Sequence, residues 1–472
     1  MSQEPEAGGG DPPISTHAVA VIGAATAGAE VASRLAERGV LVTVFEQNAR
    51  PFGKIEDGLP RWHAKLREKE YERITAKLST PGIDYVPRTT LGDDVQFDAL
   101  LAPRSEGGWG YTALVLANGA WRDRPLEVKH GPDPELLVGH GFEYQNPFVI
   151  SFNHAFDERF EGPRITIPKG GGVVIGGGLA AIDVAKILNL EAVHVALRER
   201  GIEVSTDELE HAGIPESLDA LGLTWHDLDL HAATVCYRRR VADMAVVTMP
   251  DGADQTRRAQ IEATREKFIA KVRAKFLVEI EPLVAPEALV VADGQVTGLL
   301  LRRTVMADGR LVRTDEKFEL PANIVVSSIG SIPRPIRGIP MRGELYDFDP
   351  NRPGNLTDRD DVFAVGNVLT GKGNITVSRR HAIEISDSAI EAYLGISDTP
   401  GAGPDADPHA GPAAVSQAAG RVADELLRRT ATIDALAPEA LADIRARVRA
   451  RQRTVGYSGD LAAWIAASGG PC

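Results

Sequence analysis

The chain has 472 residues, of which 43% are hydrophobic and 25% are charged, and its formal net charge is −14 at pH 7. This length exceeds one ordinary hydrophobic core, so we expect two domains and an appendage. The acidic balance excludes a general nucleic-acid binder, which needs a dominant positive field, and no apolar run is long enough to span a membrane. The composition therefore predicts a soluble protein with neither nucleic-acid nor membrane partners.

The N-terminal segment and the cysteines limit the cellular setting. Residues 1–16 have neither a basic start nor an apolar stretch, so we interpret them as a disordered lead-in to a cytoplasmic protein. Only Cys236 and Cys472 occur, which leaves no Cys-x-x-Cys pair. An internal dithiol relay and a cysteine-ligated iron–sulfur cluster are thereby excluded.

The first structured segment reads as strand, turn, helix and strand. The strand Ala18–Ile22 leads into the turn Gly23–Gly28, and a helix follows that ends at Gly39. A second strand, Leu41–Phe45, is followed by the acidic Glu46. This order predicts a dinucleotide-binding βαβ unit.

The residue types of the turn suit a bound pyrophosphate. Gly23 permits the sharp turn, the small Ala25 lets the backbone approach the phosphates, and Gly28 lets the helix pack closely on the strand. Ala27 belongs to the same loop, and Glu46 can bind ribose hydroxyls. Because Ala25 replaces the usual middle glycine, an ordinary strand-to-helix turn is the alternative, although the acidic strand end favours the nucleotide.

A second copy of this pattern follows later in the chain. Val173–Ile175 is expected to form a short buried strand, Gly176–Ala181 a second phosphate loop, and Ile182–Leu190 a helix. Two such loops in one chain are more specific than either alone, since each domain would bind one nucleotide. The candidate ligands in this loop are Gly176, Gly178, Leu179 and Ala180.

The strand that follows the second loop ends in basic residues. After an insertion at Arg198–His231 that we expect to be helical, the strand Ala233–Tyr237 leads into Arg238, Arg239 and Arg240. An acid there would suit the ribose of NAD, whereas arginines bind a 2′-phosphate through charge-assisted bonds. Arg238 and Arg239 therefore favour NADPH over NADH, and a solvated basic strand end is the alternative.

The remaining elements complete the two domains and a tail. They are, in chain order, a charged helix at Asp254–Leu277, strands at Leu289–Val291, Val296–Leu301, Ile324–Gly330 and Asp361–Asn367, and a helix at Thr376–Leu394. Residues 396–413 read as a flexible linker and residues 414–472 as a helical tail. In the tail, Val448, Trp464 and Ile465 offer apolar contacts for docking onto the body or onto a partner chain.

Taken together, these motifs resemble the two-nucleotide flavoprotein reductases typified by adrenodoxin reductase, by bacterial ferredoxin–NADP reductases and by the small subunit of glutamate synthase. The resemblance covers residues 17–395. Its marks are the first loop; the flavin-proximal segment Pro51–Pro60 with Gly53 and Lys54; the turn Ala117–Ala120 with Asn118 and Gly119; the hinge Asn146–Val149; the second loop and its helix with Asp183; the end of the strand at Tyr237–Arg239; and the closing segment with Gly366, Asn367, Gly373, Asn374 and Ile375.

The resemblance implies an α/β fold of two Rossmann-like domains, one inserted in the other, with a helical C-terminal tail. Residues 17–160 and 320–395 would bind FAD, and residues 161–319 would bind NADP(H). Hydride would pass from NADPH to FAD, and electrons onward to a ferredoxin or another iron–sulfur carrier. In the closing segment, backbone amides near Asn374 and Ile375 would stabilise negative charge on the reduced flavin.

Because the cofactors carry the chemistry, we predict no catalytic residue and no metal site. His381 reads as a structural helix residue, and Arg379 and Arg380 as solvated or ion-paired arginines. An acidic carrier would need a basic surface, for which Arg257, Arg258 and the alternating arginines of the tail are candidates. Those tail arginines are Arg445, Arg447, Arg449, Arg451 and Arg453, which cannot all lie on one helix face.

Departures from the family leave the partner and the oligomeric state open. Asn367 replaces the usual acid or aromatic residue, and Val368–Lys372 matches no well-studied branch closely. One alternative is an electron-input subunit of a larger redox complex. Another is a flavin oxidase or dehydrogenase that acts on a small substrate, against which the second loop with Arg238 and Arg239 speaks.

Overall fold

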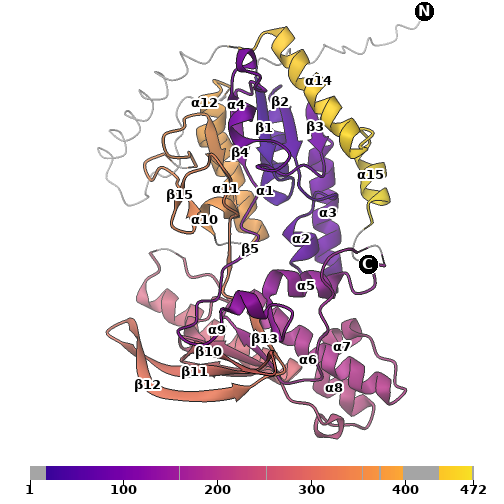
Figure 1. Ribbon diagram of the computed structural model, residues 1–472, viewed down its shortest axis with the longest axis vertical. Helices are drawn as coiled ribbons and strands as arrows, with labels where there is room; N and C mark the ends of the chain where they lie inside the picture. Colours follow the sequence, from indigo (N-terminus) through magenta and orange to yellow (C-terminus); the bar gives the residue numbers. More distant parts are fainter. Residues whose placement is uncertain are drawn as a thin grey trace, which may run out of the picture. The chain divides into compact units, whose positions relative to one another are not determined.

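The computed structural model describes residues 17–158, 160–250, 252–352, 354–371, 374–396 and 435–469. The chain divides into two compact units (Figure 1). Of the described residues, unit 1 comprises those within 17–55, 65–121 and 332–469, and unit 2 comprises those within 56–64 and 122–331. The predicted lead-in 1–16, the predicted linker from residue 397 onward, Gly373 and Cys472 lie outside the described residues.

Unit 1 is built on a five-stranded sheet in which every neighbouring pair is parallel. Its strand order is β17-β4-β1-β2-β3. The strands are β1 (Ala18–Ile22), β2 (Leu41–Phe45), β3 (Ile83–Val86), β4 (Ala113–Leu116) and β17 (Val362–Ala364). Because β1, β2 and β4 are buried along their whole length, their near-continuous Ala, Val, Leu and Ile runs are those expected of a parallel sheet covered on both faces.

Besides this sheet, unit 1 contains helices and a hairpin of two short strands. The helices are α1 (Thr26–Glu37), α2 (Lys54–Asp57), α3 (Ala64–Leu78), α4 (Phe97–Leu101), α10 (Asn367–Thr370), α11 (Ile375–Ile385), α12 (Glu391–Tyr393), α14 (Pro438–Val455) and α15 (Leu461–Ala467), with a π-helical turn at Ser386–Ile390. Two short strands, β15 (Met341–Arg342) and β16 (Leu345–Tyr346), form a separate hairpin. The predicted helix Thr376–Leu394 is therefore a run of three helical pieces.

The C-terminal helices dock onto unit 1, which decides between the two options that the sequence left open. Ile444 and Val448 of α14 are fully buried in the same core cluster as β1 and β4. The indole Nε1 of Trp464 in α15 donates to the Ala49 carbonyl at 2.6 Å. Figure 1 shows α14 running alongside β3, the edge strand of the sheet.

Unit 2 contains a second parallel five-stranded sheet, of order β6-β13-β7-β8-β9. Its strands are β6 (Phe142–Tyr144), β7 (Gly172–Ile175), β8 (Thr234–Tyr237), β9 (Glu279–Pro282) and β13 (Ile324–Ser327). Its helices are α5 (Gln145–Asn153), α6 (Leu179–Glu199), α7 (Thr206–Ala212), α8 (Ile214–Ala220) and α9 (Gln255–Phe276). The short strands β5 (Arg122–Asp123) and β14 (Ser331–Ile332) pair with each other.

An antiparallel sheet of three strands packs beside this parallel sheet in unit 2. It consists of β10 (Val284–Ala292), β11 (Gln295–Ala307) and β12 (Arg310–Pro321). Leu299 and Leu301 of β11 share a core cluster with Val173 and Val325 of the parallel sheet. The two strands predicted here are the apolar parts of β10 and β11, whereas β12 was not predicted.

The limits of the units differ from the domain limits expected from sequence. Three stretches that the sequence places in the first domain lie in unit 2, namely residues 56–64, 122–160 and 320–331. For the last two stretches the reason is strand pairing, since β6 and β13 pair with each other and β13 also pairs with β7. Among the helices of the described segments, none combines the length and the apolar character that crossing a bilayer requires.

Candidate functional site

The first glycine loop has the close backbone approaches that its residue types predict. Gly23 has φ +97°, and a Cβ there would lie 2.7 Å from the Ala117 carbonyl oxygen. A Cβ on Gly28 would lie 1.8 Å from the Gly23 carbonyl oxygen, so only glycine fits. Helix α1 begins after Ala25 without a side-chain cap. Amide groups of its first turn are thus left to bind an anion such as a phosphate.

Glu46 connects the end of β2 to this loop. Its Oε2 accepts a hydrogen bond from the Ala24 amide at 2.9 Å, and its Oε1 accepts from the Asn48 amide at 2.8 Å. The side chain is only 4% exposed. Because each carboxylate oxygen has two lone pairs, Glu46 retains capacity to accept from ribose hydroxyls.

Three further segments that the sequence singled out meet around the same loop. A Cβ atom built on Gly53 would lie 3.1 Å from the Cβ of Ala25, and one built on Gly366 would lie 2.9 Å from the Cβ of Ala27. Both glycines therefore lie directly against the first loop. Asn118 follows β4, next to Gly23, and its Nδ2 donates to the Tyr346 hydroxyl at 3.2 Å. Gly119 follows with φ +65°, and Lys54 lies exposed at the start of α2.

One buried polar atom at this loop has no partner in the described part of the chain. It is Oδ1 of Asn118, and a buried amide oxygen without a hydrogen bond costs free energy unless a ligand or water donates to it. The sequence indicated Asn118 but not Tyr346, which holds the amide in place. No local pattern marks Tyr346, because its role depends on a hairpin distant in sequence.

The closing segment lies on α10 and α11, next to the first loop. Asn367 Oδ1 accepts from the Ser378 hydroxyl at 3.0 Å, and Asn374 caps α11 by accepting from the Val377 amide at 3.0 Å. Ile375 begins α11, which packs against α1. The Gly366 amide donates to Nδ1 of His381 at 3.0 Å. His381 thus has a structural contact at the site.

The two arginines beside His381 are engaged with carboxylates. Arg379 pairs with Glu70 and lies 4.0 Å from Glu30. Arg380 lies 3.6 Å from Glu384 on the same helix. These three contacts agree with the ion-paired interpretation of these arginines.

The second loop repeats this geometry in unit 2. A Cβ on Gly176 would lie 2.3 Å from the Ser328 carbonyl oxygen, so the loop runs directly against the end of β13. Helix α6 begins after Gly178 without a side-chain cap. Leu179, 48% exposed, and the exposed Ala180 form its first turn. A solvent-facing apolar side chain at an uncapped helix start suits a bound nucleotide.

Arg238 and Arg239 lie exposed just beyond the end of β8. Their carbonyl oxygens are held by Thr304 and by the Leu283 amide, at 2.9 and 3.1 Å. Among the described residues, no carboxylate lies within ion-pair distance of either guanidinium group. Arg240 differs, because it pairs with Asp243 at 2.7 Å. Two uncompensated positive charges thus follow the strand next to the second loop.

Asp183 of α6 is a titratable group that the sequence noted without assigning a role. Burial raises its pKa to about 6, Lys186 at 3.9 Å opposes this shift, and Glu210 adds to it. Lys186 is itself buried and also pairs with Glu210 at 2.8 Å. No group of acidic, histidine and cysteine side chains suited to a metal ion occurs in the described segments.

Comparisons with known proteins agree with this geometry. A model of the family described as pyridine nucleotide-disulphide oxidoreductase matches residues 17–218. The chain is 26% identical over 399 residues to the glutamate synthase [NADPH] small chain of Mycobacterium tuberculosis (strain CDC 1551 / Oshkosh), covering 81% of this chain and 67% of that one. It is 23% identical to the NADPH-ferredoxin reductase FprA of Mycobacterium leprae, covering 82% and 86% of the two chains.

A solved structure has the same fold. Mycobacterium tuberculosis FprA in complex with NADPH superposes with a TM-score of 0.62 at 19% identity, covering 93% of this chain and 90% of that one. A likeness at this identity shows the fold. The predicted α/β fold with two Rossmann-like domains and C-terminal helices is confirmed.

Proposed function

We propose that the chain is an FAD-dependent oxidoreductase of the adrenodoxin reductase-like family of flavoproteins, which have two dinucleotide-binding domains. Its similarity to the pyridine nucleotide-disulphide oxidoreductase family over residues 17–218, and to the glutamate synthase small chain and NADPH-ferredoxin reductase relatives, supports this proposal. The protein takes hydride from NADPH and passes electrons onward to a ferredoxin-like carrier. The observation that carries this proposal is the repeated geometry of the two loops, each with an uncapped helix start beside a parallel sheet. Two such loops provide one binding site for each of two nucleotides.

Unit 1 would hold FAD. The first turn of α1 would bind the pyrophosphate, Glu46 would accept from the ribose hydroxyls, and Asn118 Oδ1 would accept a hydrogen bond from the cofactor. Bound FAD supplies storage for two electrons that arrive as a hydride and leave singly. The closing segment from Gly366 to Ile375 would provide backbone amides that favour negative charge.

Unit 2 would hold NADPH, with its pyrophosphate at the start of α6. Arg238 and Arg239 would bind the 2′-phosphate, because their guanidinium groups lack carboxylate partners in the described segments. Their backbone is held by Thr304 of β11 and by Leu283, which directly precedes β10. NADH has no 2′-phosphate, so it would gain nothing from these two charges. The relatives named NADPH-ferredoxin reductase and glutamate synthase [NADPH] small chain support the same donor.

The proposed acceptor is a ferredoxin or a similar iron–sulfur protein. We also propose that the protein is cytoplasmic. The name of the FprA relatives supports this acceptor. The second candidate function is an electron-input subunit of a larger complex, which the glutamate synthase relatives favour. A partner that copurifies in a fixed ratio and receives the electrons would favour this second candidate.

The proposal is tested by mixing the purified protein anaerobically with NADPH or NADH while the absorbance of the bound flavin is followed. We expect NADPH to bleach the flavin faster than NADH at equal concentration, and added ferredoxin to restore the colour. A protein that cannot be loaded with FAD would overturn the proposal. A yellow protein that neither nucleotide reduces would indicate a small-substrate flavoenzyme instead.

A variant tests the proposed 2′-phosphate site in the same assay. Arg238→Ala with Arg239→Ala should weaken NADPH binding by at least 10-fold and leave NADH unchanged, since each charged bond contributes about 1.5 to 3 kcal/mol. Arg240→Ala is the matched control, because Arg240 is already paired with Asp243. Equal weakening of both nucleotides by the double variant would show that these arginines do not bind the 2′-phosphate.

A further inference from the structure

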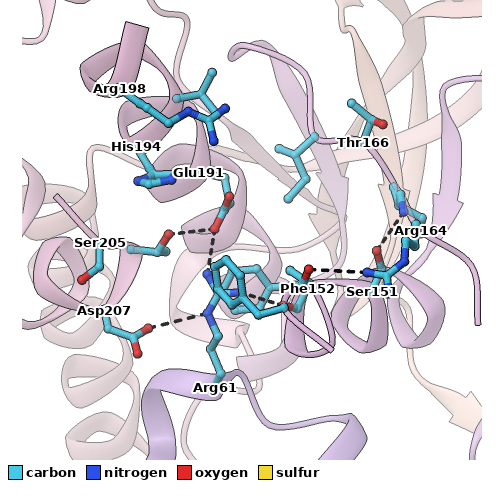
Figure 2. A pocket seen from close by; sticks show the side chains of 16 residues that line it. Arg61, Ser151, Phe152, Arg164, Thr166, Glu191, His194, Arg198, Ser205 and Asp207 are labelled. Atoms are coloured by element: carbon cyan, nitrogen blue, oxygen red, sulfur yellow. Dashed lines mark hydrogen bonds and ion pairs between the residues drawn. The ribbon is translucent and has the colours of Figure 1, made fainter. Parts of the chain in front are cut away.

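A concave site lies in unit 2, away from the second glycine loop of the same unit. It is a cavity of about 440 Å³, within the range of small-molecule sites. It is formed by the C-terminal end of α5, the segment 164–167, the C-terminal half of α6, the start of α7 and Arg61 (Figure 2).

The cavity is separate from the proposed nucleotide site on the same helix. The second loop meets α6 at Leu179, whereas the cavity is lined by Glu191, His194, Val195 and Arg198. At a rise of 1.5 Å per residue, these side chains begin roughly 18 to 28 Å farther along the helix. A ligand in the cavity therefore need not compete with a nucleotide at the loop.

One side of the cavity is apolar and includes an unusually exposed aromatic ring. The apolar wall is formed by Phe152, Ile165, Ile167 and Val195. Phe156 lies at this wall with 70% of its surface exposed. Covering such a ring removes apolar surface from water and stabilises a complex.

The two carboxylates that line the cavity, Glu191 and Asp207, already form ion pairs with Arg61. The guanidinium group of this buried residue donates to the Phe152 carbonyl at 2.7 Å and pairs with Glu191 at 3.1 Å. It also lies 3.8 Å from Asp207, and Glu191 accepts a further bond from Thr206 at 2.8 Å. Figure 2 shows Glu191 and Asp207 turned toward Arg61. Neither carboxylate is left over to bind a cation.

The positive charge that remains in the cavity belongs to two other arginines, Arg164 and Arg198. No carboxylate of the described chain pairs with either guanidinium group. The group of Arg164 donates to backbone carbonyls, including that of Asp157 at 2.6 Å. Arg198, in contrast, is exposed, and its guanidinium group makes no hydrogen bond to a described residue. It is therefore the donor left for an anion.

His194 lies one helical turn before Arg198, so the two side chains share a face of α6. Its Nδ1 is 2.7 Å from the Val204 carbonyl oxygen, which can only accept, so the proton is on Nδ1. The other ring nitrogen, Nε2, is thereby left for a ligand. The cavity thus combines an apolar wall with a free guanidinium group and an imidazole.

We propose that this cavity binds a small organic carboxylate with an apolar body. The carboxylate pairs with Arg198, whose planar fork matches its two oxygens, and the body packs against Phe156 and Val195. The site is independent of the proposed redox function.

Calorimetric titration of the full-length protein tests the proposal, with phenylpropionate as the probe and saturating NADP⁺ present to fill the nucleotide site. We expect saturable binding of phenylpropionate and weaker binding of its neutral amide. Arg198→Gln should weaken the carboxylate by on the order of 10- to 100-fold, the range for a lost charged hydrogen bond. Phe156→Ser should weaken the carboxylate and the amide alike. Both residues are exposed, so neither change should unfold the protein.

Arg200→Gln is the matched control, since Arg200 lies on the same helix end but does not line the cavity. The proposal is overturned if phenylpropionate does not bind, if the amide binds as tightly, or if NADP⁺ abolishes binding. Equal binding of inorganic phosphate would also overturn it, because the apolar wall would then contribute nothing. If the Arg198→Gln protein bound phenylpropionate as tightly as the wild type, the proposed pairing of the carboxylate with Arg198 would be wrong.

Discussion

At the scale of single residues, His381 connects helix α11 to Gly366, which lies next to the first glycine loop. Its Nδ1 accepts the Gly366 amide at 3.0 Å, so its proton is on Nε2. Burial lowers the pKa of His381 below its usual 6.5, and Glu384 partly offsets this shift. The folded protein therefore prefers the neutral imidazole, which keeps Gly366 against Ala27.

This preference predicts a pH-dependent stability. Because the folded pKa is lowered, the unfolded chain binds the proton more tightly, and the contribution of His381 is fully present above about pH 6.5. It is lost as the pH falls from there through the folded pKa. His381→Asn retains an acceptor near the position of Nδ1 but cannot titrate, so its free energy of unfolding should fall less steeply with acidification. His381→Ala should lose about 1 kcal/mol at neutral pH.

Urea unfolding between about pH 5 and pH 8 measures these differences. The comparison of wild type with His381→Asn cancels the contributions of His17 and His154, whose pKa values are also shifted, downward by burial for His17 and upward for His154. For His154, burial opposes the upward shift and hydrogen bonds with Asp57 and Asp157 cause it. Parallel pH profiles for the two proteins would show that the Gly366 contact does not depend on the charge of His381.

At the scale of elements, helix α14 sorts the alternating arginines of the tail into two faces. Arg447 and Arg451 point to the body, where Arg447 donates to the Gly107 carbonyl at 3.0 Å and Arg451 pairs with Asp94 at 2.7 Å. The three exposed arginines of this helix recur every four residues and so form a basic stripe on one face. They are Arg445, Arg449 and Arg453.

If the proposed acceptor is an acidic electron carrier, we expect it to dock on the basic stripe. Changing all three arginines of the stripe to Glu should lower kcat/KM for ferredoxin by about 10-fold at low ionic strength, because electrostatic steering acts mainly on association. The effect should shrink as salt is added. Reduction of the flavin by NADPH should be unchanged, since none of the three arginines belongs to the proposed nucleotide sites. Stopped-flow measurement of each half-reaction separates the two effects.

Arg257→Glu with Arg258→Glu provides the control, because these arginines were the other basic candidate and lie exposed on α9. If the α9 variant loses ferredoxin activity and the stripe variant does not, the carrier docks on α9. If neither variant responds, the carrier is recognised by other residues.

The elements that sequence predicts well are those whose burial is periodic or continuous. β1, β2 and β7 are continuous apolar strands, and the predicted limits of the first two match the structure. Strand β12 was missed because it is polar and mostly solvent-facing along its length, so only its pairing with β11 makes it a strand. Helix α6 runs nine residues beyond its predicted end at Leu190. Buried Val193 and Leu197 continue its apolar face there.

At the scale of the whole molecule, the glycine loops were predictable because each is a short motif between a strand and a helix. The loop residues, the Glu46 position and Asn118 meet at one place, as the resemblance implied. The cavity of unit 2 was not predictable in this way. Arg61 and Glu191 are 130 positions apart in sequence, and their ion pair exists only because the fold brings the two segments together.

The molecule as a whole also predicts how electrons leave it. The family whose model matches residues 17–218 has the word disulphide in its name. This chain, however, contains only two cysteines, Cys236 and Cys472. Cys236 is 2% exposed in β8, and burial raises the pKa of its thiol to about 12, so it stays protonated and unreactive. Electrons should therefore pass from the flavin to the external carrier without a thiol intermediate.

A cysteine-free protein, Cys236→Ala with Cys472→Ser, tests this route. NADPH-dependent reduction of ferredoxin should remain within about twofold of the wild type, because an inert thiol takes no part in transfer. Removal of the buried sulfur should cost about 1 kcal/mol of stability, which thermal unfolding measures separately. Suppose instead that NADPH still bleached the flavin while ferredoxin reduction stopped. A thiol would then lie on the electron path, and the acceptor would have to be sought among disulphide substrates.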